Sequence, residues 1–232
     1  MHLIAFTLAD GIGPVLTVPV IALAAWASGA MSWRGALGGF LIGLAITAGA
    51  GWAGLAMLGA LLLFGTLVSR RNARRRSALQ AFCNGAAASA AALAALAGAD
   101  WGLAAVGGAL SAALSDTVAG ELGQRLGRKP RLLLFGPVLP AGADGAMSVP
   151  GTLLGALAAA LVPLFGLLAG APWDLRSVAL IAGAGLAGNL IDSLLGAFVQ
   201  PRLGRHGNDW VNLMATGASA LLAAQLVGAI SQ

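Results

Sequence analysis

The sequence predicts an all-α integral membrane protein, a polytopic bundle of seven or eight transmembrane helices that forms one domain over residues 1–232. Of the 232 residues, 59% are hydrophobic, only 9% are charged, and 35 are glycine. Soluble domains average roughly 25% charged residues, so this chain has too few polar side chains to cover a water-exposed surface. A disordered chain is excluded as well, because it needs low hydrophobicity and high charge. A single cysteine excludes an internal disulfide framework.

Eight apolar runs are the candidate spans, because about 20 apolar residues cross the hydrocarbon core as a helix. They lie at 4–29, 35–50, 52–68, 78–98, 101–122, 150–170, 177–198 and 209–229. The alternative is a seven-span arrangement in which the first run is peripheral. In the longest connection, 123–149, Pro137 and Pro140 disfavour helix, and we expect an extended or re-entrant piece at 132–139.

The basic residues predict the orientation. If the N-terminus lies outside, 12 of the 13 basic residues lie in connections on the same side of the membrane. They are Arg34, Arg70, Arg71, Arg74, Arg75, Arg76, Arg125, Arg128, Lys129, Arg131, Arg202 and Arg205. The positive-inside rule then places both termini outside a cell (inner) membrane and the long connections in the cytoplasm. The net charge of +5 is therefore explained by topology, and no nucleic-acid partner is expected.

Two aspartates inside predicted spans are the strongest candidates for a site. Asp116 and Asp192 each lie fifteen residues after the outer start of their spans, near 101 and 177, which is roughly 22 Å along a helix. Both carboxylates therefore reach the same level, about 8 Å below the cytoplasmic boundary of a 30 Å core. A divalent cation such as Mg²⁺ between them would keep both ionised. The alternative is structural pairing with arginine or hydrogen bonding between helices.

Other polar residues are expected on the same face. Asn84 lies in the first turns of its span, and Asn208, Asp209 and Asn212 open the last one. Glu121 is a third candidate ligand for the metal. It follows Asp116 by five residues, a spacing that does not share one face of a regular helix, so a break at a nearby glycine would be needed. The two asparagines within spans, Asn84 and Asn212, are also compatible with hydrogen bonding between helices.

A glycine-rich segment leads into the sixth span. Gly142, Gly145, Ser148, Gly151 and Thr152 surround a predicted helix start, where Ser148 can cap the helix. Free N–H groups at such a start attract phosphate, and the nearby Arg125, Arg128 and Lys129 would add positive charge. The segment is not a Walker A loop, because it lacks the Gly-Lys-Ser/Thr ending.

These residues fall in five ordered motifs that resemble the membrane family called domain of unknown function 92, which includes transmembrane protein 19 and the plant and cyanobacterial phytyl-phosphate kinase. The motifs are Gln80-x-x-x-Asn84-Gly85, Ser115-Asp-Thr-x-Ala-x-Glu-Leu-Gly123, Gly142-x-x-Gly-x-x-Ser-x-x-Gly-Thr152, Gly188-x-x-x-Asp-Ser-Leu-Leu-Gly-Ala-x-x-Gln200 and Asn208-Asp-x-x-Asn212. The sequence departs from the family pattern at Gly120, commonly serine, and at Ala143-Asp144. The resemblance implies a membrane-bound kinase that phosphorylates a polyprenyl monophosphate to its diphosphate.

A weaker resemblance concerns the nucleotide. Asp116-Thr-x-Ala followed by Gly123-x-x-Leu-Gly-Arg-Lys-Pro-Arg131 is similar to the signature region of CDP-diacylglycerol synthase, and Asp192-Ser193 is similar to a later acidic pair of that family. Phytol and dolichol kinases look similar at this level. The resemblance implies CTP as donor, with Mg²⁺, at the cytoplasmic face.

With these resemblances, the sequence predicts a Mg²⁺-dependent prenyl-phosphate kinase of lipid metabolism. Its partners would be a nucleoside triphosphate, which the second resemblance implies to be CTP, and a membrane lipid. A homodimer is compatible with the sequence. In this interpretation Asp116 and Asp192, with Glu121, hold the metal, and the basic residues and the glycine-rich segment bind phosphate. Asn84, Asn208 and Asn212 orient substrate groups or metal-bound water, and Asp209 is a further residue of the nucleotide site. Two alternatives are a CTP-dependent lipid cytidylyltransferase and a small-molecule or lipid transporter, which would also explain polar residues in glycine-broken helices.

Overall fold

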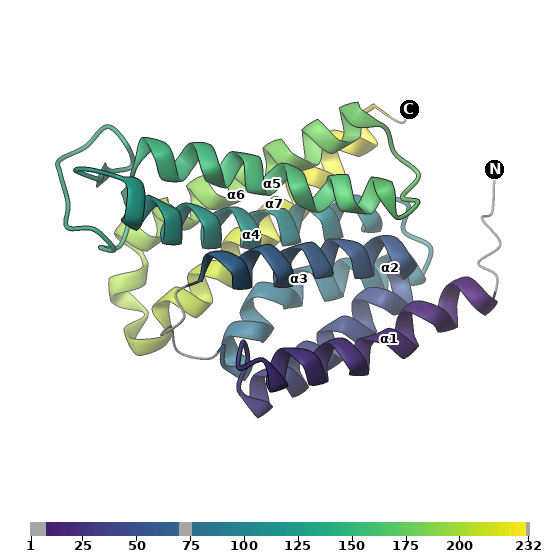
Figure 1. The fold of residues 1–232 in the computed structure, drawn as a ribbon. Helices are drawn as coiled ribbons and strands as arrows, with labels where there is room; N and C mark the ends of the chain where they lie inside the picture. Colours follow the sequence, from purple (N-terminus) through teal and green to yellow (C-terminus); the bar gives the residue numbers. More distant parts are fainter. Residues whose placement is uncertain (1–7, 70–75, 231–232) are drawn as a thin grey trace.

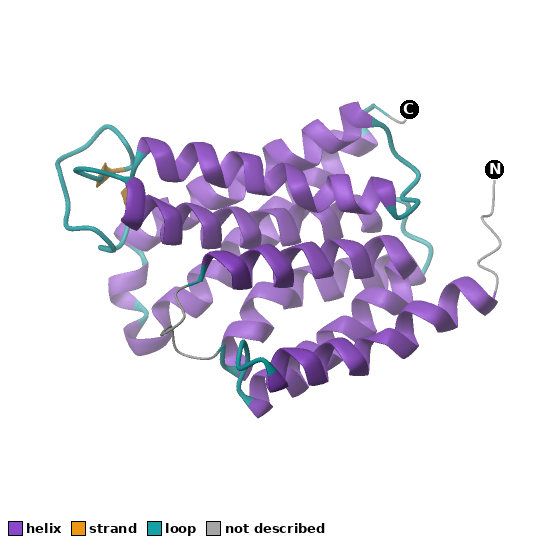
Figure 2. Cartoon of the chain, in the orientation of Figure 1, coloured by secondary structure: helices purple, strands orange, loops and turns teal. Residues whose placement is uncertain are grey.

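The computed structural model describes residues 8–69 and 76–230, which fold into a helical bundle (Figures 1 and 2). The described part of the chain contains seven α-helices: α1 Leu8–Ala27, α2 Trp33–Val68, α3 Ala78–Leu96, α4 Gly102–Leu126, α5 Val149–Leu168, α6 Leu175–Phe198 and α7 Gly207–Gly228. Two 3₁₀ turns, η1 Gln200–Arg202 and η2 Gly204–His206, join α6 to α7. Six helices of this part are long and apolar enough to cross a membrane, while α1 contributes the shorter apolar segment Ile12–Ala27.

The helix α2 accounts for the difference between seven helices and eight predicted spans. Gly51 has φ 52° and ψ −141°, a backbone conformation that breaks the helix and that L-residues rarely adopt. Beyond it the chain doubles back: a Cβ placed on Gly43 would lie 3.7 Å from Leu58, and Gly35 and Gly65 both lie against Arg76. A straight helix of 36 residues would separate its ends by about 54 Å, so α2 is a hairpin. Its arms, 33–50 and 52–68, coincide with the second and third predicted runs.

The centre of the bundle is α4, which packs against α2, α3, α5, α6 and α7 (Figure 1). Small residues let its neighbours approach closely: a Cβ on Gly108 would lie 2.6 Å from the carbonyl oxygen of Ser219 in α7. The buried Ser219 hydroxyl lies within hydrogen-bond distance of the carbonyl oxygens of Gly108 (2.7 Å) and Ala184 (2.9 Å). These contacts hold α4, α6 and α7 together and fix the helix that carries Asp116.

The connection between α4 and α5 forms a lobe at one end of the bundle, at the left in Figure 1. It contains the antiparallel strands β1, Arg131–Leu132, and β2, Ala146–Met147, in which Arg131 pairs with Met147. The extended conformation predicted for 132–139 holds only at Leu132 and at the bridge between Arg131 and Val138, because the residues between them form tight turns.

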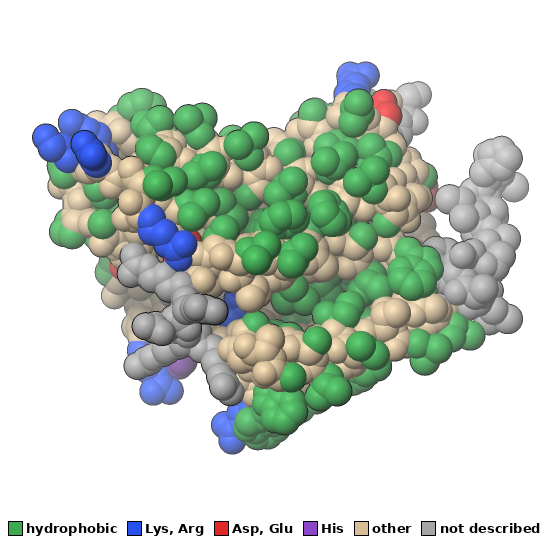
Figure 3. Space-filling view, in the orientation of Figure 1, with side chains coloured by type: hydrophobic (Ala, Val, Ile, Leu, Met, Phe, Trp, Pro, Cys, Tyr) green, Lys and Arg blue, Asp and Glu red, His purple; other side chains and the backbone are tan. Residues whose placement is uncertain are grey.

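Apart from Arg176, the described lysine and arginine residues gather at the end of the bundle that carries this lobe (Figure 3). Arg125 donates to the carbonyl oxygen of Val68 (2.6 Å) and Arg76 lies against Gly65, so α2, α3 and α4 share this end. The opposite end carries Asp100, Asp174 and Arg176, and α1 begins and α7 ends there (Figure 1). The arginines 70, 71, 74 and 75 lie outside the described residues.

Candidate active site

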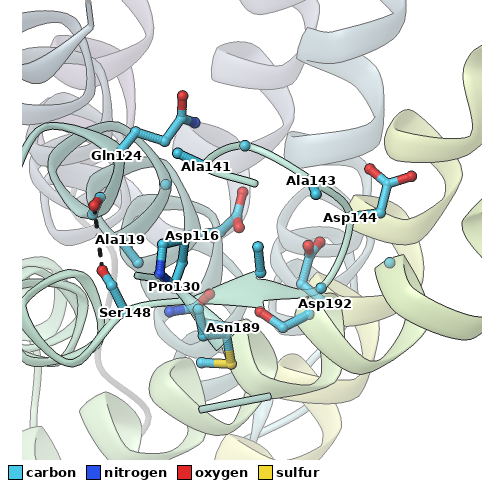
Figure 4. Close-up of a pocket in the computed structure, with 18 of the residues that line it drawn as sticks. Asp116, Ala119, Gln124, Pro130, Ala141, Ala143, Asp144, Ser148, Asn189 and Asp192 are labelled. Atoms are coloured by element: carbon cyan, nitrogen blue, oxygen red, sulfur yellow. Dashed lines mark hydrogen bonds between the residues drawn. The ribbon is translucent and has the colours of Figure 1, made fainter. Parts of the chain in front are cut away.

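A cavity of about 160 Å³ opens at the basic end of the bundle, between α4, α6 and the α4–α5 connection (Figure 4). Carboxylates, amides, hydroxyls and glycines make up most of its lining. These residues are Asp116, Gly120, Gly123 and Gln124 of α4; Gly142, Asp144, Gly145 and Ser148 of the connection; Thr152 of α5; Asn189, Asp192, Ser193 and Gly196 of α6; and Gln200 and Asn208 beyond it. We call this space the acidic cavity.

Asp116 and Asp192 come from different helices and both point into the acidic cavity (Figure 4). The Oδ2 atom of Asp192 is buried and has no hydrogen-bond partner among the residues that the structure describes. Neither carboxylate forms an ion pair with a basic residue of the described ranges. Two partly buried carboxylates that line one cavity without a basic partner repel each other, so this pair fits a cation with oxygen ligands such as Mg²⁺.

Asn189 is a residue of this site that the sequence analysis missed. Its Nδ2 atom donates to the Ser115 hydroxyl (3.1 Å) between α6 and α4, and its side chain is almost fully buried. This bond joins the residue before Asp116 to the residue one turn before Asp192, and it therefore fixes the two carboxylates relative to each other. A polar residue three positions before Asp192 in an apolar span was the signal that could have identified it.

The glycine-rich segment covers the acidic cavity from the lobe side. Gly142 and Gly145 have φ 83° and 72°, and a Cβ on Gly145 would lie 2.6 Å from the Ala197 side chain. Glycine at 145 thus lets the segment lie against α6. The Gln200 amide donates to Asp144 Oδ1 (2.7 Å), which fastens the segment to η1.

The helix start at α5 differs from the prediction at Gly151. Ser148 caps α5, as predicted, by accepting from the Gly151 N–H (3.2 Å). That N–H is therefore engaged, and Gly151 does not line the cavity. A Cβ on Gly151 would lie 2.7 Å from the Ala119 carbonyl oxygen, so this glycine allows α5 to pack against α4. The Ser148 hydroxyl also donates to the Gly123 carbonyl (3.3 Å), the dashed line in Figure 4.

Three basic residues predicted to bind phosphate do not line the acidic cavity. Arg125 contacts Glu121 (3.2 Å) and the Val68 carbonyl, while Arg128 and Lys129 are exposed in the connection. No lysine or arginine of the described ranges lines the cavity. Within the described ranges, a bound cation would therefore be the source of the positive charge that a triphosphate requires.

Glu121 is not brought to the other two carboxylates, and the prediction that it shares their metal is not supported. The helix α4 continues without a break through Gly120 and Gly123, so the glycine break that this prediction required is absent. Within the described ranges, no cluster of three or more His, Cys, Asp or Glu side chains could hold a metal ion. Asp116 and Asp192 are the two predicted ligands that remain for such a site. Asp144 also lines the cavity, where its Oδ1 atom accepts a hydrogen bond from Gln200.

Of the four other polar residues predicted for this site, only one lines the acidic cavity. Asn208 lines the acidic cavity. Asp209 lies 3.4 Å from the His206 ring and Asn212 is buried in α7, and neither lines the cavity. Asn84 lines a different cavity, between α1, α2, α3 and α4.

The bundle and its acidic cavity define the class: a polytopic α-helical membrane protein with a polar site at one end of its helices. The chain belongs to the integral membrane protein family DUF92, whose model matches residues 16–220. An uncharacterized membrane protein of Methanocaldococcus jannaschii is 36% identical over 213 residues, which cover 87% of this chain and 88% of that protein. Protein VTE6, chloroplastic, of Arabidopsis thaliana is 31% identical over 112 residues, which cover 47% of this chain and 33% of that protein. No solved structure matches the chain.

Proposed function

We propose that this protein is a membrane-bound phosphotransferase that converts an isoprenoid monophosphate to its diphosphate, with CTP as donor. The convergence of Asp116 and Asp192 on one cavity, without a basic partner among the described residues, carries the proposal. The kinase class is supported by the motifs shared with a family that includes phytyl-phosphate kinase and by the partial match to Protein VTE6.

The residues of the acidic cavity suit the donor half of this reaction. Asp116 and Asp192 would hold Mg²⁺, which would neutralise charge on the donor phosphates. The glycine-rich segment at 142–148 brings backbone and Ser148 to the same space, and Thr152 in the first turn of α5 also lines it. Asn189 and its bond to Ser115 hold the carboxylates in place.

The proposed reaction needs few further catalytic groups from the protein. An oxygen of the acceptor phosphate attacks the γ-phosphorus of CTP, the bond from that phosphorus to the β–γ bridging oxygen breaks, and CDP leaves with the electron pair. A phosphate acceptor is already nucleophilic, so no general base is required. Positioning and charge stabilisation supply the rate acceleration.

The test uses the purified protein in Mg²⁺ with phytyl monophosphate or geranylgeranyl monophosphate and CTP that is radiolabelled in either its α- or its γ-phosphate. The proposal expects the γ-label, and not the α-label, in the lipid product. Transfer of the α-label would instead identify a cytidylyltransferase. No transfer of either label to any prenyl phosphate would refute the enzyme class and leave the transporter.

Two variants make this test specific for the site. Asp192→Asn should lose transfer of the γ-label. Asp100→Asn, which makes the same chemical change at an exposed position at the opposite end of the bundle, should keep it. Equal losses in both variants would contradict the assignment of the acidic cavity.

A further inference from the structure

A second cavity, of about 80 Å³, lies between α1, both arms of α2, α3 and α4. Its walls are largely apolar side chains, among them Val18 and Ile21 of α1, Ile42 of the first arm of α2, and Leu55 and Leu58 of the second arm. We call it the apolar cavity. It is separate from the acidic cavity and shares no lining residue with it.

The polar groups of the apolar cavity come from α4 and from the chain around the start of α3. Gln80 and Asn84 are four residues apart on one face of α3, Arg76 lies just before this helix, and Thr117 of α4 lines the same cavity. These helix segments lie at the basic end of the bundle, whereas Ile42, Leu55 and Val18 lie further in. The cavity is therefore amphipathic along its length, with a cationic head end and an apolar body.

Arg76 is held in place but forms no ion pair within the described part of the chain. Its backbone bonds to Ala30 and Ser32, and its guanidinium lies against Gly65, where a Cβ would be 2.8 Å from a terminal nitrogen. Among the described residues, no side chain or carbonyl forms a hydrogen bond with the guanidinium. Burial lowers the pKa of Arg76, and the charge of Glu121 opposes this shift. A partly buried cation of this kind favours an anionic ligand.

The two cavities meet at α4. Asp116 lines the acidic cavity and the next residue, Thr117, lines the apolar one. With about 100° of rotation per residue, Gly120 lies on α4 between the directions of Asp116 and Thr117, one turn closer to the basic end. A Cβ on Gly120 would meet nothing within 4 Å. This side of α4 therefore leaves open space between the acidic cavity and the head end of the apolar cavity.

The wall formed by α1 faces the surroundings of the bundle. The helix α1 packs mainly on α2 and exposes large apolar side chains, including Leu16, Val20 and Leu23, away from the bundle. Figure 3 shows a crevice between α1 and the helices above it. A hydrocarbon chain longer than the cavity can therefore continue past α1 into the bilayer.

We propose that the apolar cavity binds the acceptor, a prenyl monophosphate, with its phosphate at Arg76, Asn84 and Gln80 and its first isoprene units among the apolar residues. This inference rests on the proposed function and assigns the acceptor to a place distinct from the donor. The charge at the head end selects a phosphate over an alcohol. The apolar body selects a lipid phosphate over inorganic phosphate.

The first test needs no turnover. Geranylgeranyl monophosphate with a diazirine in its first isoprene unit is photo-crosslinked to the full-length protein in nanodiscs, and the labelled peptides are mapped by mass spectrometry. Labelling is expected on α1 and α3, with competition by unlabelled geranylgeranyl monophosphate. Labelling confined to the outer faces of α5 and α6, or equal labelling by the corresponding diazirine alcohol, would overturn the inference. Equal competition by inorganic phosphate or by phosphatidic acid would also overturn it.

Matched variants test the head and the body separately. Arg76→Gln should reduce crosslinking and raise the apparent KM for the lipid by about tenfold or more without changing the KM for CTP. Arg76→Lys should recover part of the loss. Arg34→Gln, an exposed arginine in the first turn of α2, is the control and should leave both unchanged.

For the body of the cavity, Ala22→Phe should weaken crosslinking, whereas Ala24→Phe on the exposed face of the same helix should not. Equal effects within either pair of variants would overturn the assignment. Crosslinking in the apolar cavity without phosphoryl transfer would refute the proposed function alone. Transfer with crosslinking elsewhere would refute this inference alone.

Discussion

Asp116 and Thr117 are consecutive residues of α4, yet their side chains line two different cavities. The acidic cavity carries carboxylates, amides and hydroxyls, and the apolar cavity carries an arginine at the head of an apolar body. A reaction between a charged nucleotide and a lipid needs both environments next to each other. The single helix α4 provides them because successive residues point about 100° apart.

Gly120 lies where these two environments meet, and a large side chain there should obstruct the transfer. Its Cβ position is open, so Gly120→Phe should fold normally. We expect kcat to fall by roughly tenfold or more, because a misplaced acceptor loses the alignment that catalysis depends on. The measurement is the steady-state rate of label transfer from γ-labelled CTP. Gly183→Phe is the control, since Gly183 in α6 is equally open and exposed; the same loss in both variants would contradict the role of Gly120.

Glu121 provides a test that separates the structure from the sequence-based expectation. It pairs with Arg125 at 3.2 Å and does not line the acidic cavity. Exposed pairs of this kind contribute about 0–1 kcal/mol to stability. Because Glu121 lies outside the acidic cavity, Glu121→Gln should leave the Mg²⁺ dependence of activity unchanged in a Mg²⁺ titration. A shift of the half-saturating Mg²⁺ concentration by about tenfold or more would restore Glu121 as a metal ligand.

The depth of the two aspartates could be predicted from the sequence, because helix rise converts residue number into depth. Their common cavity follows from that depth and from α4 and α6 being neighbours. The neighbourhood of Asn84 could not be predicted in this way: depth does not say which helices touch, and α3 borders the apolar cavity instead. The prediction that Arg128 and Lys129 lie at the phosphate site was wrong, because hydrophobic periodicity does not show the path of a loop.

Most of the helices could also be predicted from the sequence, but the strands and the closure of the α2 hairpin could not. Composition and apolar runs predict an all-α membrane bundle, and the boundaries of α3 to α7 agree with the runs to within a few residues. The lobe strands were missed, because two-residue strands have no periodicity to detect. The hairpin of α2 lies at the break between two predicted runs, but the backbone conformation of Gly51 that closes it is visible only in the structure.

The orientation of the bundle gives a third prediction. Arg128 lies in the exposed lobe connection and Asp100 at the opposite end, and the native Cys83 is buried. In intact cells, Arg128→Cys should be labelled by a membrane-impermeant maleimide only after permeabilisation, and Asp100→Cys without it. The reverse pattern would turn the bundle over and place both cavities outside.

The close approach of α2 and α3 gives a fourth prediction. A Cβ on Gly49 would overlap the backbone carbonyl of Ala92 in α3, whereas a Cβ on Gly59 in the other arm of α2 would meet nothing. Gly49→Ala should lower the free energy of unfolding by about 1–3 kcal/mol because backbone must move. Gly59→Ala should be neutral or stabilising by up to about 1 kcal/mol. Unfolding in mixed detergent micelles measures both, and equal stabilities would contradict this packing.

The last prediction concerns the two carboxylates of the acidic cavity. If Asp116 and Asp192 hold one Mg²⁺, Asp116→Asn and Asp192→Asn should each reduce kcat by roughly a hundredfold or more. The double variant should be scarcely worse, because groups that act as a unit are strongly non-additive. Each variant should remain folded, since an amide in place of a partly buried carboxylate without a basic partner in the described ranges relieves desolvation and repulsion. Structural pairing between helices predicts the opposite pattern: lower thermal stability, with activity surviving in the folded fraction.

Transfer from γ-labelled CTP and thermal unfolding, measured on the same monodisperse preparations, distinguish the metal site from structural pairing. Near-normal turnover of folded Asp192→Asn would exclude the metal assignment.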